Sequence, residues 1–442
     1  MPIPSFPERK SNSLPAFCFL VCLISSCFAA EKLAAQENLP FPKKTVHGGL
    51  SSDSILNREE FSLFVPSSIP DSGNTPLILF FDPQGDGSAP LKLYADLAAK
   101  AGVLIAGSNR CKNGLSGGEA LMEGRVFYSQ LTTLFPHLRF RIYLAGFSGG
   151  AVLASALSRE LPEIRGLIYA AAPSIAIPSC PSIGITGMAD PNFHEMRSLQ
   201  ERIPENIPHC LRYWNGKHAW PPAESMAFAF DWIQTREGKG EAAIELLRKS
   251  RRRCATKSSM AETGEQLELR VFLASSLNVP GDDSLSLAVW KASPAYKKFY
   301  SRSILDAKEE QKQKDFYLVA FIRRDPDWWK QETERLRKAG ALRLKEQRLL
   351  GYLSLLGWSF ASRSLNSGNA KDAEKYVELY HMIDPENPEP FFLQAISYAR
   401  KGNLKAASQS LKKAADLGFA DKKRLLAQSE FSVMDLSSIF SD

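Results

Sequence analysis

The chain has 442 residues, of which 44% are hydrophobic and 23% charged, so its composition is globular and excludes wholesale disorder and fibrous folds. This length allows two or three domains of roughly 100–200 residues each. The net charge of +7 is spread along the chain without a basic patch or binding motif, which argues against a nucleic-acid partner.

Residues 1–30 have the pattern of an export signal and are set apart from the fold. After a positive start, the 11 uncharged residues Leu14–Ile24 are too few to span a bilayer, which needs about 20. The segment Ile-Ser-Ser-Cys27 resembles a bacterial lipobox, so Cys27 is a candidate for lipidation and a membrane tether. Residues 28–30 offer a rival cleavage site that would give soluble secretion. We therefore expect an exported protein, held in the periplasm or cell envelope or secreted.

After a linker at 31–54, residues 55–235 alternate short apolar runs with amphipathic stretches. The predicted strands are Phe61–Val65, Leu77–Phe81, Val103–Ala106, Arg141–Ala145, Leu167–Ala171, Ile183–Thr186 and Leu211–Trp214. The predicted helices are Leu91–Ala101, Gly118–Leu134, Ala151–Leu161 and Asn192–Ile203. A turn is predicted at 70–75. This alternation predicts an α/β domain with a mainly parallel sheet and helices on both faces.

The strongest chemical signal is Gly-Phe-Ser148-Gly-Gly, which lies between a predicted strand and an alanine-rich predicted helix. A nucleophile elbow has this pattern, because its serine sits in a strained turn and the flanking glycines allow close backbone approach. The helix N-terminus would also favour negative charge developing near Ser148. We predict that Ser148 is a nucleophile; the alternative is an ordinary serine in a structural turn.

A serine hydroxyl needs a general base, and after this elbow an acid and then a histidine are expected along the chain. Of the six histidines, two precede Ser148 and one lies in the C-terminal repeat region. His194 is expected on a helix, and His209 at the start of its strand, which is the wrong end of the sheet. His218 follows the last predicted strand on a glycine-containing loop, so we predict that His218 is the base.

The acid of such a site orients the imidazole and stabilises its protonated form. Asp190 lies on the loop after the predicted strand Ile183–Thr186, whereas the preceding strand offers no carboxylate at its end. We predict that Asp190 is the acid; the alternative is that it caps the helix near Asn192.

An oxyanion hole requires backbone N–H donors near the nucleophile. One is expected from Gly149, and a second from the loop that follows the strand Leu77–Phe81. Because Pro83 has no N–H, Gln84 is the first candidate for this second donor and Gly85 the reserve.

The cysteines beyond the signal are Cys111, Cys180, Cys210 and Cys254. They include no CxxC pair and no tight Cys/His cluster, so a zinc site is not expected. Cys180 and Cys210 open two strands that should be neighbours, and export permits disulfides. A disulfide between Cys180 and Cys210 is therefore a structural hypothesis.

Beyond Pro222 the sequence changes in character, because glycine becomes scarce and Leu, Ala, Lys, Glu and Arg dominate. This composition predicts a helical region at 236–353, with a turn at Pro280–Asp283 and a helix that starts at Asp325. The two tryptophans that follow, at 328 and 329, are expected to pack between helices.

Residues 354–421 contain an internal repeat, which is followed by a tail at 422–442. Gly368 and Gly402 lie 34 residues apart, and the small and large residues around them resemble two tetratricopeptide repeats. That resemblance implies docking of a peptide or protein partner. The alternative is a structural cap on the catalytic domain.

Three segments resemble the α/β-hydrolases, and among them the secreted polyhydroxybutyrate-depolymerase-like and feruloyl-esterase-like enzymes: Leu77–Gly87, Gly146–Gly150 and Gly216–Pro222. The resemblance covers residues 55–235. It implies a nucleophile, an acid, a base and an oxyanion donor at Ser148, Asp190, His218 and Gly149, in that order. An Asp-Pro-Gln sequence replaces the usual His-Gly after the first of these segments.

Together these features predict an exported serine hydrolase that cleaves acyl bonds, carboxylic esters first of all, through an acyl-enzyme. No metal or organic cofactor is implied, and the size of the ester substrate is left open. A peptide bond is the nearest competing substrate. A different class of function is an exported scaffold with an inactive hydrolase domain and partner-binding repeats.

Overall fold

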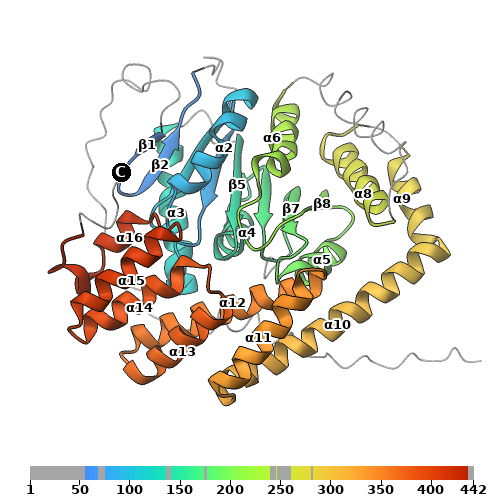
Figure 1. The fold of residues 1–442 in the computed structure, drawn as a ribbon. Helices are drawn as coiled ribbons and strands as arrows, with labels where there is room; N and C mark the ends of the chain where they lie inside the picture. The colour runs from blue at the N-terminus through green and yellow to red at the C-terminus, as the bar shows by residue number, and fades with distance from the viewer. Residues whose placement is uncertain are drawn as a thin grey trace, which may run out of the picture. The chain divides into compact units, whose positions relative to one another are not determined.

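The computed structural model describes residues 55–67, 75–135, 141–173, 177–238, 245, 260–279 and 282–436 (Figure 1). Several predicted features lie outside these residues: the export signal 1–30 with Cys27, the linker 31–54, most of the turn at 70–75, and the start of the turn at Pro280.

The chain divides by its internal contacts into two compact units. Unit 1 extends to Leu287 but leaves out two segments, Thr186–His194 and Tyr213–Ala219. These two segments group with the chain from Ala288 onward in unit 2. The ends of two strands and the loops that follow them therefore belong to the same compact unit as the helical region.

The centre of the fold is an eight-stranded sheet with the order β1-β2-β4-β3-β5-β6-β7-β8. Its strands are β1 (Ile55–Asn57), β2 (Phe61–Phe64), β3 (Leu77–Phe81), β4 (Leu104–Ser108), β5 (Ile142–Phe147), β6 (Gly166–Ala170), β7 (Ser182–Gly187) and β8 (His209–Trp214). The pairs β1–β2 and β2–β4 are antiparallel, whereas β4, β3, β5, β6 and β7 run parallel. This arrangement confirms the predicted α/β fold class.

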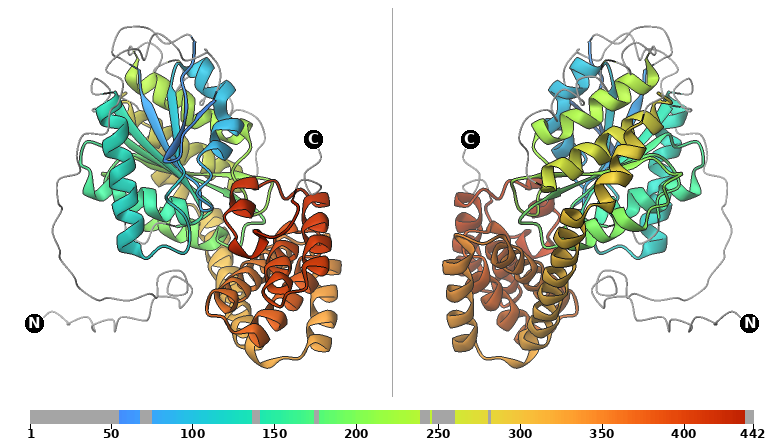
Figure 2. Two further views of the ribbon diagram at one scale, coloured as in Figure 1. Left: turned by 90° about the vertical axis from the view of Figure 1, so that its left-hand side faces the viewer. Right: turned by 90° about the vertical axis from the view of Figure 1, so that its right-hand side faces the viewer.

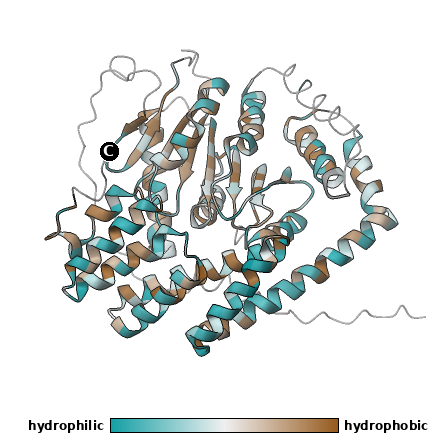
Figure 3. Ribbon diagram, in the orientation of Figure 1, coloured by the Kyte–Doolittle hydropathy of each residue, from teal (hydrophilic) through white to brown (hydrophobic). Residues whose placement is uncertain are grey.

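The helices of unit 1 pack on both faces of the sheet. They include α2 (Ser88–Ala101), α3 (Gly117–Leu134), α4 (Gly149–Glu160) and α6 (Ala223–Glu237), and α5 (Phe193–Arg202) connects β7 to β8. The left view of Figure 2 shows the sheet between α2 and α3. Strands that are covered by helices on both faces are apolar along their whole length. In β3, for example, all five residues are apolar and buried (Figure 3).

Each of the seven predicted strands is present, with bounds that differ from the prediction by at most two residues. Strand β1 was not predicted. It has three residues, ends in Asn57 and pairs on one side only, so its sequence lacks the apolar run that marks a buried strand.

The C-terminal part of the chain is helical, as predicted. Its helices are α8 (Met260–Ser276), α9 (Asp283–Ala292), α10 (Pro294–Arg323), α11 (Pro326–Gly340), α12 (Leu344–Asn366), α13 (Ala370–Ile383), α14 (Pro388–Arg400), α15 (Leu404–Asp416) and α16 (Lys422–Leu426). The carboxylate of Asp325 accepts a hydrogen bond from the Trp328 N–H at 2.8 Å and so begins α11 at the predicted position. Within the described ranges, no helix is both long and apolar enough to cross a bilayer.

Two helix pairs lie where the internal repeat was predicted. Helix α12 packs against α13, and α14 packs against α15. Gly368 and Gly402 follow the first helix of each pair with φ angles of +73° and +74°, a conformation that favours glycine. The resemblance to tetratricopeptide repeats itself stays a prediction.

Cys180 and Cys210 are unbridged buried thiols, which corrects the predicted disulfide. The Ser182 N–H donates to the Pro208 carbonyl at 2.9 Å, so Cys210 lies beside the start of β7 and not beside Cys180. An offset of about three residues corresponds to ~10 Å along a strand. A disulfide needs Cα atoms about 4.4–6.8 Å apart.

Candidate active site

Ser148 occupies the sharp turn between β5 and α4. Its φ is +51° and its ψ −122°, a backbone conformation that is rare and strained for a residue with a side chain. The Ser148 N–H donates to the Ala170 carbonyl at 2.9 Å, which ties the turn to the neighbouring strand β6. The residue is half-buried, so it is not sealed from solvent.

The two outer glycines of the G-x-S-x-G segment are required by backbone packing. A Cβ at Gly146 would lie 2.2 Å from the Gly150 carbonyl oxygen, and a Cβ at Gly150 would lie 1.9 Å from the Phe81 carbonyl oxygen. Helix α4 can therefore begin directly against β3 and β5 only with glycine at both positions. This close approach forms the elbow that the sequence predicted.

Asp190 lies on the loop after β7 and is completely buried. Its Oδ1 accepts a hydrogen bond from the Asn192 N–H at 2.8 Å, and its Oδ2 accepts one from the His218 Nδ1–H at 2.9 Å. The loop is further fixed because the Ala189 N–H donates to the Gly216 carbonyl at 2.9 Å. Capping at Asn192, considered as an alternative role, thus coexists with a contact to His218.

His218 follows β8, and its side chain is 14% exposed. A carboxylate can only accept hydrogen bonds, so Nδ1 of His218 carries a proton and donates a hydrogen bond to Asp190. In the neutral ring the unprotonated nitrogen is then Nε2, which is the atom that accepts a proton when the ring acts as a base. The structure therefore joins two of the predicted residues in the orientation that base catalysis needs.

The predicted site residues fall in both compact units. Ser148 and Gly149 belong to unit 1, whereas Asp190 and His218 belong to the segments grouped with unit 2. The structure brings Asp190 and His218 together. The approach of Ser148 to His218 stays a prediction.

The two N–H groups predicted as second oxyanion donors already have acceptors within their own loop. The Gln84 N–H donates to Asp82 Oδ1 at 2.8 Å, and the Gly85 N–H donates to the Asp82 carbonyl at 3.1 Å. Gly149 is the first residue of α4, where backbone N–H groups have no acceptor within the helix. The role of Gly149 therefore fits its position, but neither loop donor is presented to a substrate in this structure.

Asp82 and Trp220 link the loop after β3 to the segment after His218, and sequence reasoning identified neither. The Trp220 Nε1–H donates to Asp82 Oδ2 at 2.8 Å, and the indole ring packs on Phe147 with 5.4 Å between ring centres. Burial raises the pKa of Asp82, and the hydrogen bonds from Trp220 and Gln84 only partly oppose that shift. The carboxylate after β3 is thus a buried acceptor beside the elbow.

Asn113 is a further polar residue at the elbow that sequence reasoning missed. Its N–H donates to the Pro83 carbonyl at 2.8 Å, and its side-chain oxygen lies 2.0 Å from the point where a Gly149 Cβ would be. The residue is exposed, so its amide is accessible from solvent. No motif marks it, because it comes from the loop after β4, which the pattern of nucleophile elbows does not specify.

The remaining histidines described by the structure have other surroundings. His194 is on α5 near Glu310, His209 begins β8 and contacts the Ile207 carbonyl, and His381 lies on α13. Within the described ranges, no group of three or more His, Cys, Asp or Glu side chains is arranged to hold a metal ion.

No protein-family model matches the sequence, and no curated protein matches it. Among solved structures, a candidate α/β-hydrolase of unknown function from Agrobacterium tumefaciens is 17% identical over 41% of this chain and 95% of its own, with a TM-score of 0.34. A hyperthermophilic esterase from the archaeon Pyrobaculum calidifontis is 10% identical over 41% of this chain and 85% of its own, with a TM-score of 0.32. A thermophilic carboxylesterase cloned from a metagenomic library is 11% identical over 40% of this chain and 83% of its own, with a TM-score of 0.33.

Proposed function

We propose that the protein is a serine hydrolase that cleaves acyl bonds, carboxylic esters first of all, with Ser148 as nucleophile, His218 as base and Asp190 as acid. The observation that carries this proposal is the 2.9 Å hydrogen bond from His218 Nδ1 to the buried Asp190 carboxylate. In a histidine fixed in this way, Nε2 is the ring nitrogen that accepts the proton of a hydroxyl nucleophile.

Trp220, which follows His218 closely in the chain, contacts the residue before Ser148. Trp220 packs on Phe147, which precedes Ser148, and Trp220 is only two residues from His218. Two residues of chain reach about 7 Å at most. This reach is between Cα atoms, and the approach of the His218 ring to the Ser148 hydroxyl is part of the proposal.

The proposed reaction follows from these positions. The Ser148 hydroxyl attacks the acyl carbon while His218 Nε2 takes its proton, and Asp190 stabilises the imidazolium that forms. The Gly149 N–H donates to the oxyanion. His218 then returns the proton to the departing alcohol, and water releases the acyl group from the serine by the same steps in reverse order.

A second oxyanion donor is proposed at Asn113, because the two loop donors already have acceptors. Its side-chain amide lies against Gly149, with Oδ1 2.0 Å and Nδ2 3.4 Å from the point where a Gly149 Cβ would be. Rotation of this amide would present its two N–H groups to the same oxygen. A side-chain amide beside a backbone N–H is an established composition for an oxyanion hole.

Labelling with a fluorophosphonate probe tests the proposal. Wild type should be labelled, Ser148→Ala should not, and Ser129→Ala should be labelled like wild type, because Ser129 is an exposed serine on α3. Labelling of Ser148→Ala, or none of wild type, would refute the proposal. Side-by-side rates on 4-nitrophenyl esters and on peptides then separate esterase from peptidase activity.

The scaffold alternative is favoured by one observation, the engagement of both predicted loop donors at Asp82. An inactive domain would leave wild type unlabelled by the probe. A pull-down with full-length protein and with a variant lacking 354–421 then tests whether the repeats bind a partner protein.

The finer assignments rest on sequence resemblance and are retained as proposals. A substrate panel of short-chain esters, methyl ferulate and polyhydroxybutyrate separates a general esterase from the two resembled enzyme types. Export with lipidation at Cys27 predicts that labelled palmitate is incorporated into wild type and lost in Cys27→Ser.

A further inference from the structure

A cluster of buried charges lies in the helical region, outside the proposed triad. Glu310 and Lys314 are on α10, and their side chains are 1% and 2% exposed. Arg348 is on α12, and its side chain is 9% exposed. Charged side chains are almost never buried unless they are paired, because removal from water costs several kcal/mol per ion. A buried cluster therefore needs a reason for its position.

Glu310 pairs with the cations of this cluster. Its carboxylate accepts hydrogen bonds from Arg348 Nε at 3.0 Å and Nη2 at 2.8 Å, and it forms an ion pair with Lys314 at 3.7 Å. His194 Nε2 lies 3.3 Å from the same carboxylate. Burial alone would raise the pKa of Glu310, but the contacts with His194 and Arg348 outweigh it and lower the pKa to about 2. The carboxyl group is thus held ionised.

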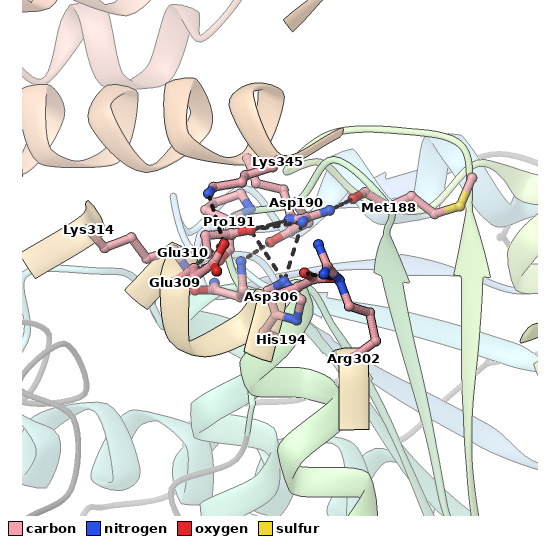
Figure 4. A network of polar contacts seen from close by, with 12 residues as sticks. Met188, Asp190, Pro191, His194, Arg302, Asp306, Glu309, Glu310, Lys314 and Lys345 are labelled. Carbon is pink, nitrogen blue, oxygen red and sulfur yellow. Dashed lines mark hydrogen bonds and ion pairs between the residues drawn. The ribbon is translucent and has the colours of Figure 1, made fainter. Parts of the chain in front are cut away.

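Both cations also donate to the backbone of the loop that carries Asp190. Figure 4 shows Glu310 and Lys314 beside this loop. Arg348 Nη1 donates to the Met188 carbonyl at 3.0 Å, and Lys314 Nζ donates to the Pro191 carbonyl at 2.5 Å. These two carbonyls lie two residues before and one residue after Asp190. The charged groups therefore hold the loop that carries Asp190, called the acid loop below, on both sides of Asp190.

Helix α12 also makes a van der Waals contact with this loop. A Cβ at Gly351, three residues after Arg348, would lie 3.2 Å from Pro191 Cδ, so the helix packs closely against the loop. Arg348 is further stacked over the Phe193 ring, with its guanidinium carbon 5.1 Å from the ring centre. All of these residues belong to unit 2.

We propose that Glu310, Lys314 and Arg348 are positioning residues for the acid of the active site. In this role the helical region keeps the Asp190 carboxylate aligned on His218 by fixing the loop backbone around it. A structural cap could be held by apolar contacts alone and would not need buried cations aimed at loop carbonyls. The proposal rests on the proposed function, because Asp190 matters for rate only if His218 acts as a base.

The test uses full-length variants in matched pairs. Glu310→Gln and Arg348→Met disrupt the cluster at the acid loop. Glu332→Gln and Arg335→Met disrupt a more exposed ion pair in α11, where Glu332 accepts from Tyr317 and Arg335. Among the described residues, the contacts of this pair stay within α10 and α11. Misplacing a reacting group by about 1 Å can cost on the order of 100-fold in rate.

Two measurements are made on every variant that unfolds cooperatively. The first is kcat and KM on 4-nitrophenyl butyrate, where we expect kcat to fall ~10–100-fold for the acid-loop variants with KM nearly unchanged, and little change in the controls. The second is hydrogen–deuterium exchange of the peptide 186–194, which should become faster only in the acid-loop variants. Arg348→Lys, which keeps the charge, should restore part of kcat.

Each outcome decides between explanations. Faster exchange with a lowered kcat supports the proposal, whereas wild-type kcat in folded Glu310→Gln or Arg348→Met overturns it. Unchanged exchange at 186–194 also overturns it, even if activity falls. If Glu310→Gln does not fold, Lys314→Met, which removes the hydrogen bond to Pro191 and the ion pair with Glu310, is judged by the same two measurements. An inactive, unlabelled wild type would instead refute the proposed function, and the exchange measurement still judges the contact.

Discussion

The substitution Gly150→Ala tests whether the close packing of α4 on β3 holds the nucleophile in position. The added Cβ would lie 1.9 Å from the Phe81 carbonyl oxygen, whereas real Cβ atoms essentially never approach a heavy atom within 3.0 Å. Helix and strand must therefore separate by about 1 Å or more. Overpacking of this kind typically costs about 1–3 kcal/mol, and a 1 Å shift of a reacting group can cost on the order of 100-fold in rate.

We expect Gly150→Ala to lower the free energy of unfolding by about 1–3 kcal/mol and to slow fluorophosphonate labelling at least tenfold in the fraction that remains folded. Urea unfolding and labelling rates measure the two effects separately. Gly118→Ala on α3 is the matched control, because a Cβ there meets nothing within 4 Å and alanine favours a helix over glycine by up to about 1 kcal/mol. A Gly150→Ala protein that unfolds and labels like wild type would refute the reasoning.

Four further predictions concern the pKa shifts of Glu310, Asp82 and Cys180 and the second oxyanion donor. The pKa of Glu310 is lowered from 4.5 to about 2, so its contribution to stability is complete above the unfolded value and is lost as the pH falls toward 2; Glu310→Gln should flatten the acid-unfolding curve. Burial raises the pKa of Asp82, so its ionisation lowers the free energy of unfolding as the pH rises. The free energy of unfolding of Asp82→Asn, measured relative to wild type in urea titrations, should therefore be higher at about pH 8 than at about pH 4. Burial likewise raises the pKa of Cys180 to about 11, so iodoacetamide should label it only slowly before denaturation; rapid labelling of the native thiol would contradict its burial. Asn113→Ala should lower kcat on esters about 100-fold if the amide donates to the oxyanion, and a change below about threefold would exclude that role.

Local patterns made the sheet and the pairing of Asp190 with His218 predictable. The strand Leu77–Phe81 has the predicted bounds because its five residues form a continuous buried apolar run that ends at an Asp-Pro sequence. Asp190 and His218 were found by the same logic, since each follows a strand at its carboxyl end. The carboxyl ends of parallel strands lie at the same edge of a sheet. Residues that directly follow such strands are therefore expected to lie close together.

The residue types of the loop after β3 already predict that the Gln84 N–H has an acceptor within the loop. Aspartate side chains commonly accept a hydrogen bond from the N–H two residues ahead, and Asp82 does so with Gln84. The Asp-Pro-Gln order therefore already contained a competitor for that N–H. The part of the site that Asn113 and Trp220 add could not be found in this way, because it depends on the packing of loops distant in sequence.

The positioning cluster was hidden because its residue types normally mean exposure. Glu310 and Lys314 are four residues apart on one helix, a spacing that is typical of solvent-exposed ion pairs. Arg348 is 160 residues from the Met188 carbonyl that it contacts, and no periodicity relates positions so far apart. The change in composition beyond Pro222 therefore marks where the strands give way to helices. It does not mark the residues that contact the acid loop, because these are buried cations within the helical region.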